Sequence, residues 1–140
     1  MDLAKSARRI EEDMEQLALC SDTPGEGITR LPFTAAARRT VDTLVGQMRS
    51  AGLSVREDAA GNLIGRLEGE DPEAPAILIG SHYDSVPHGG NFDGMAGIEV
   101  GIELVRMLRE EGIVLEHPIE VIGTVDEEGV RFGTGYFGVD

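Results

Sequence analysis

The chain has 140 residues, of which 26 are acidic and 12 are basic, so its formal net charge is −14. An acidic chain repels nucleic acids and anionic membrane surfaces, and the sequence therefore predicts neither kind of partner. The length allows at most one domain, no apolar run is long enough to cross a bilayer, and the single cysteine, Cys20, excludes an internal disulfide. These features together predict a protein of the reducing cytoplasm.

The acidic residues are unevenly distributed. Residues 1–56 contain 8 acidic and 8 basic residues, whereas residues 57–140 contain 18 acidic and 4 basic ones. Two explanations stay open at this point: a solvated acidic surface, or carboxylates gathered around cations.

The first part of the chain predicts two amphipathic helices. Apolar residues recur at steps of three and four from Leu3 to Leu17, which is the pattern of a helix with one buried face. A loop rich in proline and glycine follows over residues 21–32. Thr34 is a candidate N-cap and Gly52 a candidate C-terminal stop, which together predict a second helix of about 17 residues.

The second part of the chain predicts strands and one more helix. Residues 53–57 and 63–67 are expected to pair as a hairpin. Residues 76–80 are continuously apolar, the pattern of a strand buried on both faces. A helix with apolar positions over residues 98–108 and a strand over residues 119–125 complete a parallel, right-handed crossover. The predicted fold class is α/β, of the three-layer type, with a mixed and partly parallel sheet.

Side chains that bind metals follow both of the parallel strands. His82 and Asp84 come directly after the first strand, Asp93 stands where the third helix begins, and Glu127 and Glu128 follow the second strand. Because ligands of open α/β sheets gather at the carboxyl ends of the strands, these side chains are expected on one rim of the sheet.

Each of these residue types suits a metal centre. The imidazole of His82 is a ligand for a borderline metal such as zinc, and Asp84 is close enough to hold the other ring nitrogen. A carboxylate at the position of Asp93 could bridge two cations. Taken singly, the same residues could be a structural histidine, a helix cap and a solvated acidic pair, so it is their joint placement that favours a site.

Several segments resemble a known family. The segments GSHYDSVPHGGNFDG (80–94) and DEEGVRF (126–132) resemble the metal-dependent amidohydrolases that include N-carbamoyl-L-amino-acid hydrolase, allantoate amidohydrolase and β-ureidopropionase, which are relatives of the M20 aminoacylases and peptidases. Residues 27–34 and 58–66 look like earlier segments of the same family. The resemblance implies that residues 1–140 are a partial catalytic domain, the N-terminal portion of a zinc-peptidase-like fold.

The resemblance also implies roles for individual residues. His82 would bind one of two divalent ions, Asp93 would bridge both, and Glu128 would bind the second. Glu127 would be the general acid and base, and Asp84 would orient His82. Zinc or manganese is the expected metal, while cobalt and nickel also suit such ligands.

The implied reaction is hydrolysis of a linear C–N bond in a small ureido or amide compound, such as an N-carbamoyl-L-amino acid or allantoate. Full members of the family are much longer, form homodimers and take further histidine ligands from a second half of the catalytic domain. The isolated chain is expected to be inactive or nearly so, because two protein ligands for each cation are fewer than the three typical of catalytic zinc. Two alternatives stay open: an M20-type aminoacylase or peptidase, and a non-catalytic remnant that pairs with a separate C-terminal half.

Overall fold

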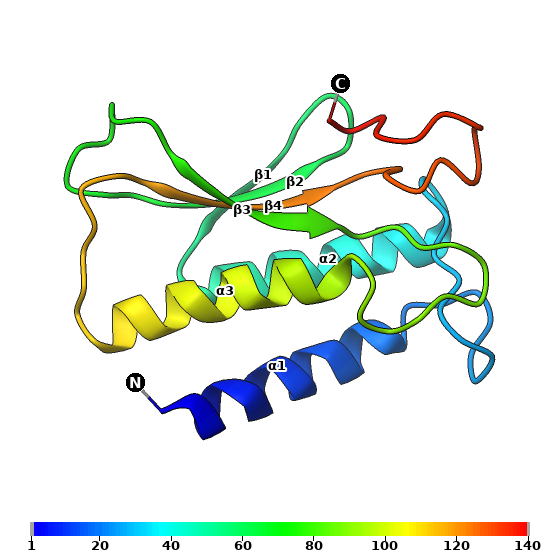
Figure 1. The fold of residues 1–140 in the computed structure, drawn as a ribbon, viewed down its shortest axis with the longest axis horizontal. Helices are drawn as coiled ribbons and strands as arrows, with labels where there is room; N and C mark the ends of the chain where they lie inside the picture. Colours follow the sequence, from blue (N-terminus) through cyan, green and yellow to red (C-terminus); the bar gives the residue numbers. More distant parts are fainter. Residues whose placement is uncertain (1, 140) are drawn as a thin grey trace.

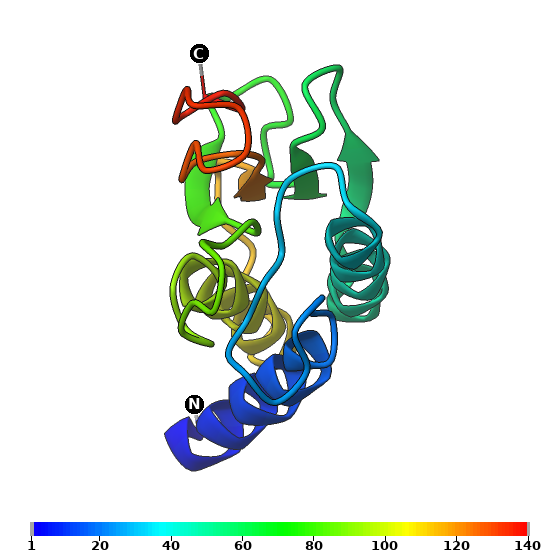
Figure 2. The ribbon, with the colours of Figure 1, turned by 90° about the vertical axis from the view of Figure 1, so that its right-hand side faces the viewer.

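A mixed sheet forms one outer layer of the fold, and all three helices lie on the same face of it (Figures 1 and 2). This arrangement comes from a computed structural model, which describes residues 2–139. Helices α2 (Ala35–Ala51) and α3 (Met95–Glu110) pack against the sheet, and α1 (Leu3–Ala18) packs across these two helices as a third layer. Among the described residues, no helix combines the length and the apolar character that a membrane span requires.

The sheet has four strands in the order β1-β2-β4-β3. The hairpin of β1 (Ser54–Glu57) and β2 (Leu63–Leu67) is antiparallel, and β4 (Ile119–Thr124) pairs antiparallel with β2. The edge strand β3 (Ile77–His82) runs parallel to β4, with His82 opposite Thr124. The predicted α/β fold with a mixed, partly parallel sheet is therefore confirmed.

Local signals in the sequence set the ends of α2. The hydroxyl oxygen of Thr34 accepts a hydrogen bond from the backbone N–H of Ala37 at 3.2 Å, which satisfies one of the free donors at the helix start. Gly52 ends the helix in the left-handed conformation at a φ of 94°, which glycine adopts at little cost. Both predicted ends of this helix are confirmed.

The prediction that residues 76–80 are buried on both faces is wrong. The side chain of Leu78 in β3 is 62% exposed and that of Ile77 is 42% exposed. One reason is that β4 lies between β2 and β3, which leaves β3 at the edge of the sheet. The other is that every helix of the described chain covers the same face of the sheet, so the second face is open. A continuous apolar run indicates a doubly buried strand only where both faces of the sheet are covered.

The core lies between the sheet and the helices and joins all of these elements. Its fully buried side chains include Leu17, Leu44, Met48, Ile98, Ile102 and Val121. This packing holds the carboxyl ends of β3 and β4 beside the start of α3, where the loop over residues 83–94 and the segment over residues 126–138 emerge at one end of the molecule (Figure 1).

Candidate metal centre

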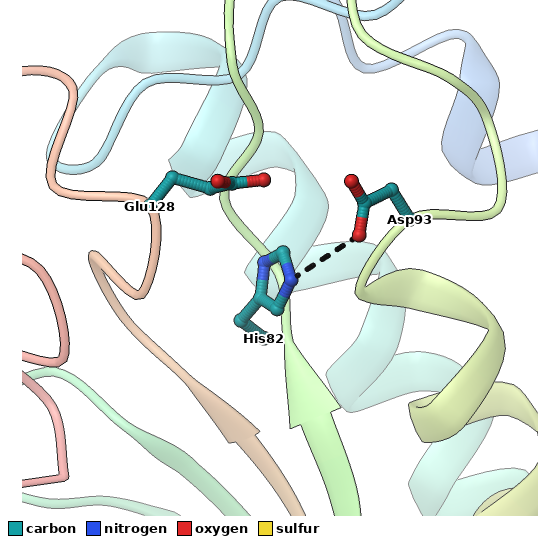
Figure 3. Close-up of side chains that lie close together, drawn as sticks. All are labelled: His82, Asp93 and Glu128. Atoms are coloured by element: carbon teal, nitrogen blue, oxygen red, sulfur yellow. Dashed lines mark ion pairs between the residues drawn. The ribbon is translucent and has the colours of Figure 1, made fainter.

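Three different segments bring the predicted ligands to one rim (Figure 3). His82 is the last residue of β3, Asp93 lies just before the N-cap of α3, and Glu128 lies in the loop that follows β4. The rim is the carboxyl end of the two parallel strands, as the sequence predicts.

The side chains of this rim approach one another closely. His82 Nε2 lies 3.6 Å from Asp93 Oδ1 and 3.8 Å from Glu127 Oε2. One ligand atom from each of His82, Asp93 and Glu128 can be chosen so that all three lie within 4.8 Å of one another. The structure therefore brings together four of the five residues that the sequence singles out, and the fifth, Asp84, lies directly behind them.

The geometry of this group suits a divalent cation. Two ligand atoms that each lie about 2.1 Å from one tetrahedral ion are about 3.4 Å apart, close to the separation of His82 Nε2 and Asp93 Oδ1. Mixed imidazole and carboxylate ligands suit zinc and manganese alike. The Asp93 side chain is 66% exposed, so the group is open to an incoming ion.

Asp84 is buried and forms hydrogen bonds with three residues of the site. Its carboxylate oxygens accept hydrogen bonds from the backbone N–H groups of Glu127 at 3.1 Å and Glu128 at 3.3 Å. His82 Nδ1 lies 3.0 Å from the backbone carbonyl oxygen of Asp84 but 3.6 Å from its carboxylate. The carbonyl is thus the closer partner of the ring, and an Nδ1–H that donates to it leaves Nε2 free to face the ligand group.

The charges of the rim perturb one another. Burial by itself lowers the pKa of His82, but the carboxylate and carbonyl of Asp84 and the carboxylate of Glu127 outweigh burial and raise this pKa to about 9. Burial raises the pKa of Glu128, and repulsion from Asp93 adds to the increase. Burial also opposes ionisation of Asp84, yet the nearby His82 ring and the hydrogen bonds from the backbone N–H groups of Glu127 and Glu128 hold the pKa of Asp84 below the ordinary value. A cation at the rim would take the place of the imidazole proton and relieve the repulsion between carboxylates.

Gly94 allows α3 to begin against the histidine ring. Its φ is 70°, and a Cβ at this position would lie 2.4 Å from the carbonyl oxygen of His82 and 2.5 Å from its ring. Any larger residue must push the start of α3, and with it Asp93, away from His82.

Replacement of Gly94 by alanine is therefore expected to weaken the binding of Zn²⁺ or Mn²⁺ by about tenfold or more, because it separates His82 from Asp93. Isothermal titration calorimetry measures the dissociation constant. The matched control is Gly90→Ala in the same loop, since no heavy atom lies within 4 Å of a Cβ at Gly90. A folded Gly94→Ala chain with the wild-type dissociation constant would contradict this account.

The segment after β4 holds Glu127 in a way that the sequence does not reveal. The chain turns back on itself, so that the backbone N–H of Tyr136 donates to the carbonyl oxygen of Glu127 at 3.1 Å and that of Phe137 donates to Asp126 at 3.3 Å. Asp126 has a left-handed φ of 54°, a conformation that is uncommon outside glycine and that is often found at functional sites. No local signal in residues 133–138 indicated this pairing.

The other two histidines bond to backbone carbonyl oxygens elsewhere in the fold. His88 Nδ1 lies 2.7 Å from the carbonyl oxygen of Glu26, and His117 Nδ1 lies 2.8 Å from that of Pro75. Both histidines are thus bonded to the backbone and lie outside the group of His82, Asp93 and Glu128.

Comparison with known proteins finds relatives that are named as hydrolases of ureido compounds. An N-carbamoyl-L-amino-acid amidohydrolase of Paenarthrobacter aurescens is 50% identical over 139 residues, which cover 99% of this chain and 34% of that protein. A ureidoglycolate hydrolase of Arabidopsis thaliana is 37% identical over 139 residues, 97% of this chain and 29% of that protein. Two allantoate deiminases of Glycine max are further relatives. The amidohydrolase resemblance seen in the sequence is thereby confirmed.

The chain belongs to peptidase family M28, whose family model matches residues 62–138, more than half of the chain. The fold agrees with this assignment. A hydantoinase/carbamoylase family amidase from Burkholderia ambifaria superposes with a TM-score of 0.89 at 40% identity, over 94% of this chain and 32% of that one. The chain spans about a third of the length of these relatives.

Proposed function

We propose that this chain contributes the metal-binding rim and the proton-transfer group of a hydrolase that cleaves linear C–N bonds in small ureido or amide compounds. The observation that carries the proposal is the convergence of His82, Asp93, Glu127 and Glu128 at the carboxyl ends of β3 and β4. The names of the relatives, which act on N-carbamoyl-L-amino acids, ureidoglycolate and allantoate, support the substrate class.

In this proposal His82 and Glu128 each bind one of two divalent cations, zinc or manganese, and Asp93 bridges them. Its ligand oxygen lies within 4.8 Å of the ligand atoms of both other residues, and a carboxylate has a second oxygen with which it could contact a second ion. Asp84 positions the rim by holding the His82 ring through its carbonyl oxygen and the two glutamate amides through its carboxylate.

When bound, the two cations would acidify a water molecule and polarise the carbonyl group that it attacks. Glu127 would accept the proton of the attacking water and return it to the departing nitrogen. Its side chain is 30% exposed beside the ligand group, so it can reach both a water molecule and a substrate. The hydrogen bonds that fix its backbone limit the motion of the carboxylate during both transfers.

Two cations need more ligands than this rim holds, since catalytic zinc commonly has three protein ligands. In the proposal, residues 2–139 are therefore part of a catalytic domain, and another segment, of the same polypeptide or of a partner chain, adds ligands and substrate contacts. A homodimer of the complete protein and a cytoplasmic location belong to the same proposal, and the buried free thiol of Cys20 suits a reducing compartment.

A second candidate function is hydrolysis of a peptide or N-acyl amide bond. The observation in its favour is the match to a peptidase family over residues 62–138. The two functions use the same groups at the rim and differ in the substrate, so a substrate panel that compares N-carbamoyl-L-amino acids and allantoate with N-acetyl amino acids and dipeptides separates them in the complete protein.

Two experiments test the proposal: metal binding by the isolated chain, and activity of a grafted enzyme in which this chain replaces the matching part of a relative. The purified chain is expected to bind Zn²⁺ or Mn²⁺ in calorimetry, and Asp93→Ala should weaken binding at least about tenfold, whereas Asp42→Ala on the exposed side of α2 should not. The chain is then substituted for the matched 139 residues of the Paenarthrobacter aurescens relative. The chimera should hydrolyse N-carbamoyl-L-amino acids, the substrate class in the relative's name, because the rim of this chain would then supply its share of the metal centre and the proton-transfer group. A folded, metal-loaded chimera without turnover would refute the proposed function.

A further inference from the structure

Arg30 is a buried cation behind the metal-binding rim. Only 3% of the residue is exposed, and its guanidinium donates to three backbone carbonyl oxygens. Nη2 reaches Leu17 at 2.7 Å and Nε reaches Cys20 at 3.1 Å, both at the C-terminal end of α1. Nη1 reaches Tyr83 at 3.3 Å, in the peptide between His82 and Asp84.

The backbone of Arg30 is joined to the same loop. Its N–H donates to Ser85 Oγ at 3.0 Å, and its carbonyl oxygen accepts from the Ser85 N–H at 3.0 Å. Ile28 and Gly89 exchange a further pair of backbone bonds at 2.9 and 2.8 Å. The segment before α2 and the loop after β3 therefore run antiparallel, with Arg30 opposite Ser85.

The charge of Arg30 complements that of Asp84. Burial lowers the pKa of Arg30 to about 10, while the nearby Cys20 and Asp84 act in the opposite direction, so the guanidinium stays protonated at neutral pH. Asp84 is 1% exposed and needs a compensating positive charge to remain ionised. The C-terminal end of a helix also stabilises a positive charge, and the Arg30 guanidinium lies at such an end, bonded to the carbonyl oxygens of Leu17 and Cys20.

We propose that Arg30 is a positioning residue of the metal centre, which clamps the peptide over residues 83–85 so that Asp84 meets the His82 ring and the amides of Glu127 and Glu128. The inference rests on the proposed function, because it takes the rim to be a metal site. Arginine suits this place because its planar fork donates in several fixed directions at once, whereas a lysine ammonium is a compact point charge.

The test compares variants of Arg30 in the whole chain. Arg30→Met is expected to weaken Zn²⁺ binding about 10–100-fold, and Arg30→Lys, which restores the charge but not the fork, should recover part of the loss. The visible absorption spectrum of the Co²⁺-loaded chain is the second readout, because its band positions report the coordination geometry of the bound ion and do not change with the amount of folded protein. The matched control, Arg49→Met on an exposed part of α2, should bind and absorb as the wild type does.

Loss of a buried cation can unfold a chain, so Ser85→Ala serves as a further variant that keeps Arg30 and removes only a hydroxyl, which accepts from the Arg30 amide and lies within hydrogen-bond distance of the Ile28 and Val86 carbonyl oxygens. It should change the Co²⁺ spectrum in the same direction and weaken binding severalfold. Wild-type affinity and spectrum in folded Arg30→Lys and Ser85→Ala chains would overturn the inference and leave the proposed function standing. Unfolding of all three variants would also overturn it, because Arg30 would then serve the fold and not the site. A wild-type chain that binds neither ion would overturn both proposals.

Discussion

Replacement of Glu127 by glutamine is expected to lower kcat/KM of the grafted enzyme by at least about 100-fold and to leave its metal content unchanged. Glutamine has the shape of glutamate but can neither accept nor return a proton, and general acid–base catalysis contributes about 10²–10⁴-fold. Glu127 lies 3.8 Å from His82 but outside the group of His82, Asp93 and Glu128 that can hold an ion. Steady-state kinetics and the calorimetric stoichiometry together check the two parts of the expectation.

The neighbouring residue supplies the matched control. Glu128→Gln makes the same chemical change one position further along, at a residue of the ligand group, and should weaken metal binding and turnover together. If Glu127→Gln also loses metal, Glu127 is a ligand and not the proton carrier. If it keeps full turnover, the proton is carried by another group.

Asp84 explains how two adjacent glutamates can have different tasks. Its carboxylate receives the N–H groups of both, so the backbone of Glu127 and Glu128 is fixed where β4 gives way to the loop. Glu128 belongs to the ligand group, while the Glu127 carboxylate lies beside that group, 3.8 Å from His82 Nε2, where it can meet a water molecule and a substrate.

The sequence predicts the features of the fold that depend on neighbouring residues. Thr34 and Gly52 mark the ends of α2 because capping and left-handed geometry are properties of single positions. The exposure of Leu78 was not predictable in the same way, since it depends on β4 entering the sheet between β2 and β3 and on which face the helices cover. Strand order is set by packing over long sequence distances and has no local signal.

The same distinction holds for the site. The convergence of His82, Asp93 and Glu128 follows from their place at the carboxyl ends of parallel strands. The carbonyl of Asp84 as the closer partner of the His82 ring, and Arg30 behind it, could not be foreseen. The first depends on the exact path of the backbone after β3 and the second on a contact across more than fifty residues of sequence, and a buried arginine in a sequence looks like any other arginine.

A buried network of charges joins α1 to α3, between these two helices. Arg106 Nη1 lies 2.6 Å from Asp13 Oδ2 and 3.5 Å from Glu103 Oε2, and Arg9 pairs with Glu103. These two arginines and two carboxylates balance one another. Glu99 is fully buried beside them, and neither of its oxygens has a hydrogen-bond donor among the described residues. An ionised Glu99 would therefore be an uncompensated buried charge.

Burial raises the pKa of Glu99 from 4.5 to about 8, repulsion from Asp13 adds to the increase, and Arg106 opposes it. At neutral pH the group is a carboxylic acid that can donate to Asp13. Because its pKa is higher in the folded chain than in the unfolded one, its contribution to stability is complete below pH 4.5 and is lost as the pH rises through about 8. The loss amounts to at most about 5 kcal/mol of unfolding free energy.

Glu99→Gln is expected to remove this pH dependence, because glutamine stays neutral and can still donate to Asp13. Urea unfolding of both chains should give similar free energies at pH 5 and a variant that is more stable than the wild type at pH 9, by up to about 5 kcal/mol. Glu12→Gln, on the exposed side of α1, controls for the loss of one negative charge and should follow the wild-type curve. Parallel curves for the wild type and Glu99→Gln between pH 5 and 9 would show that Glu99 is ionised in the folded chain and that the charges of Arg9 and Arg106 extend to it.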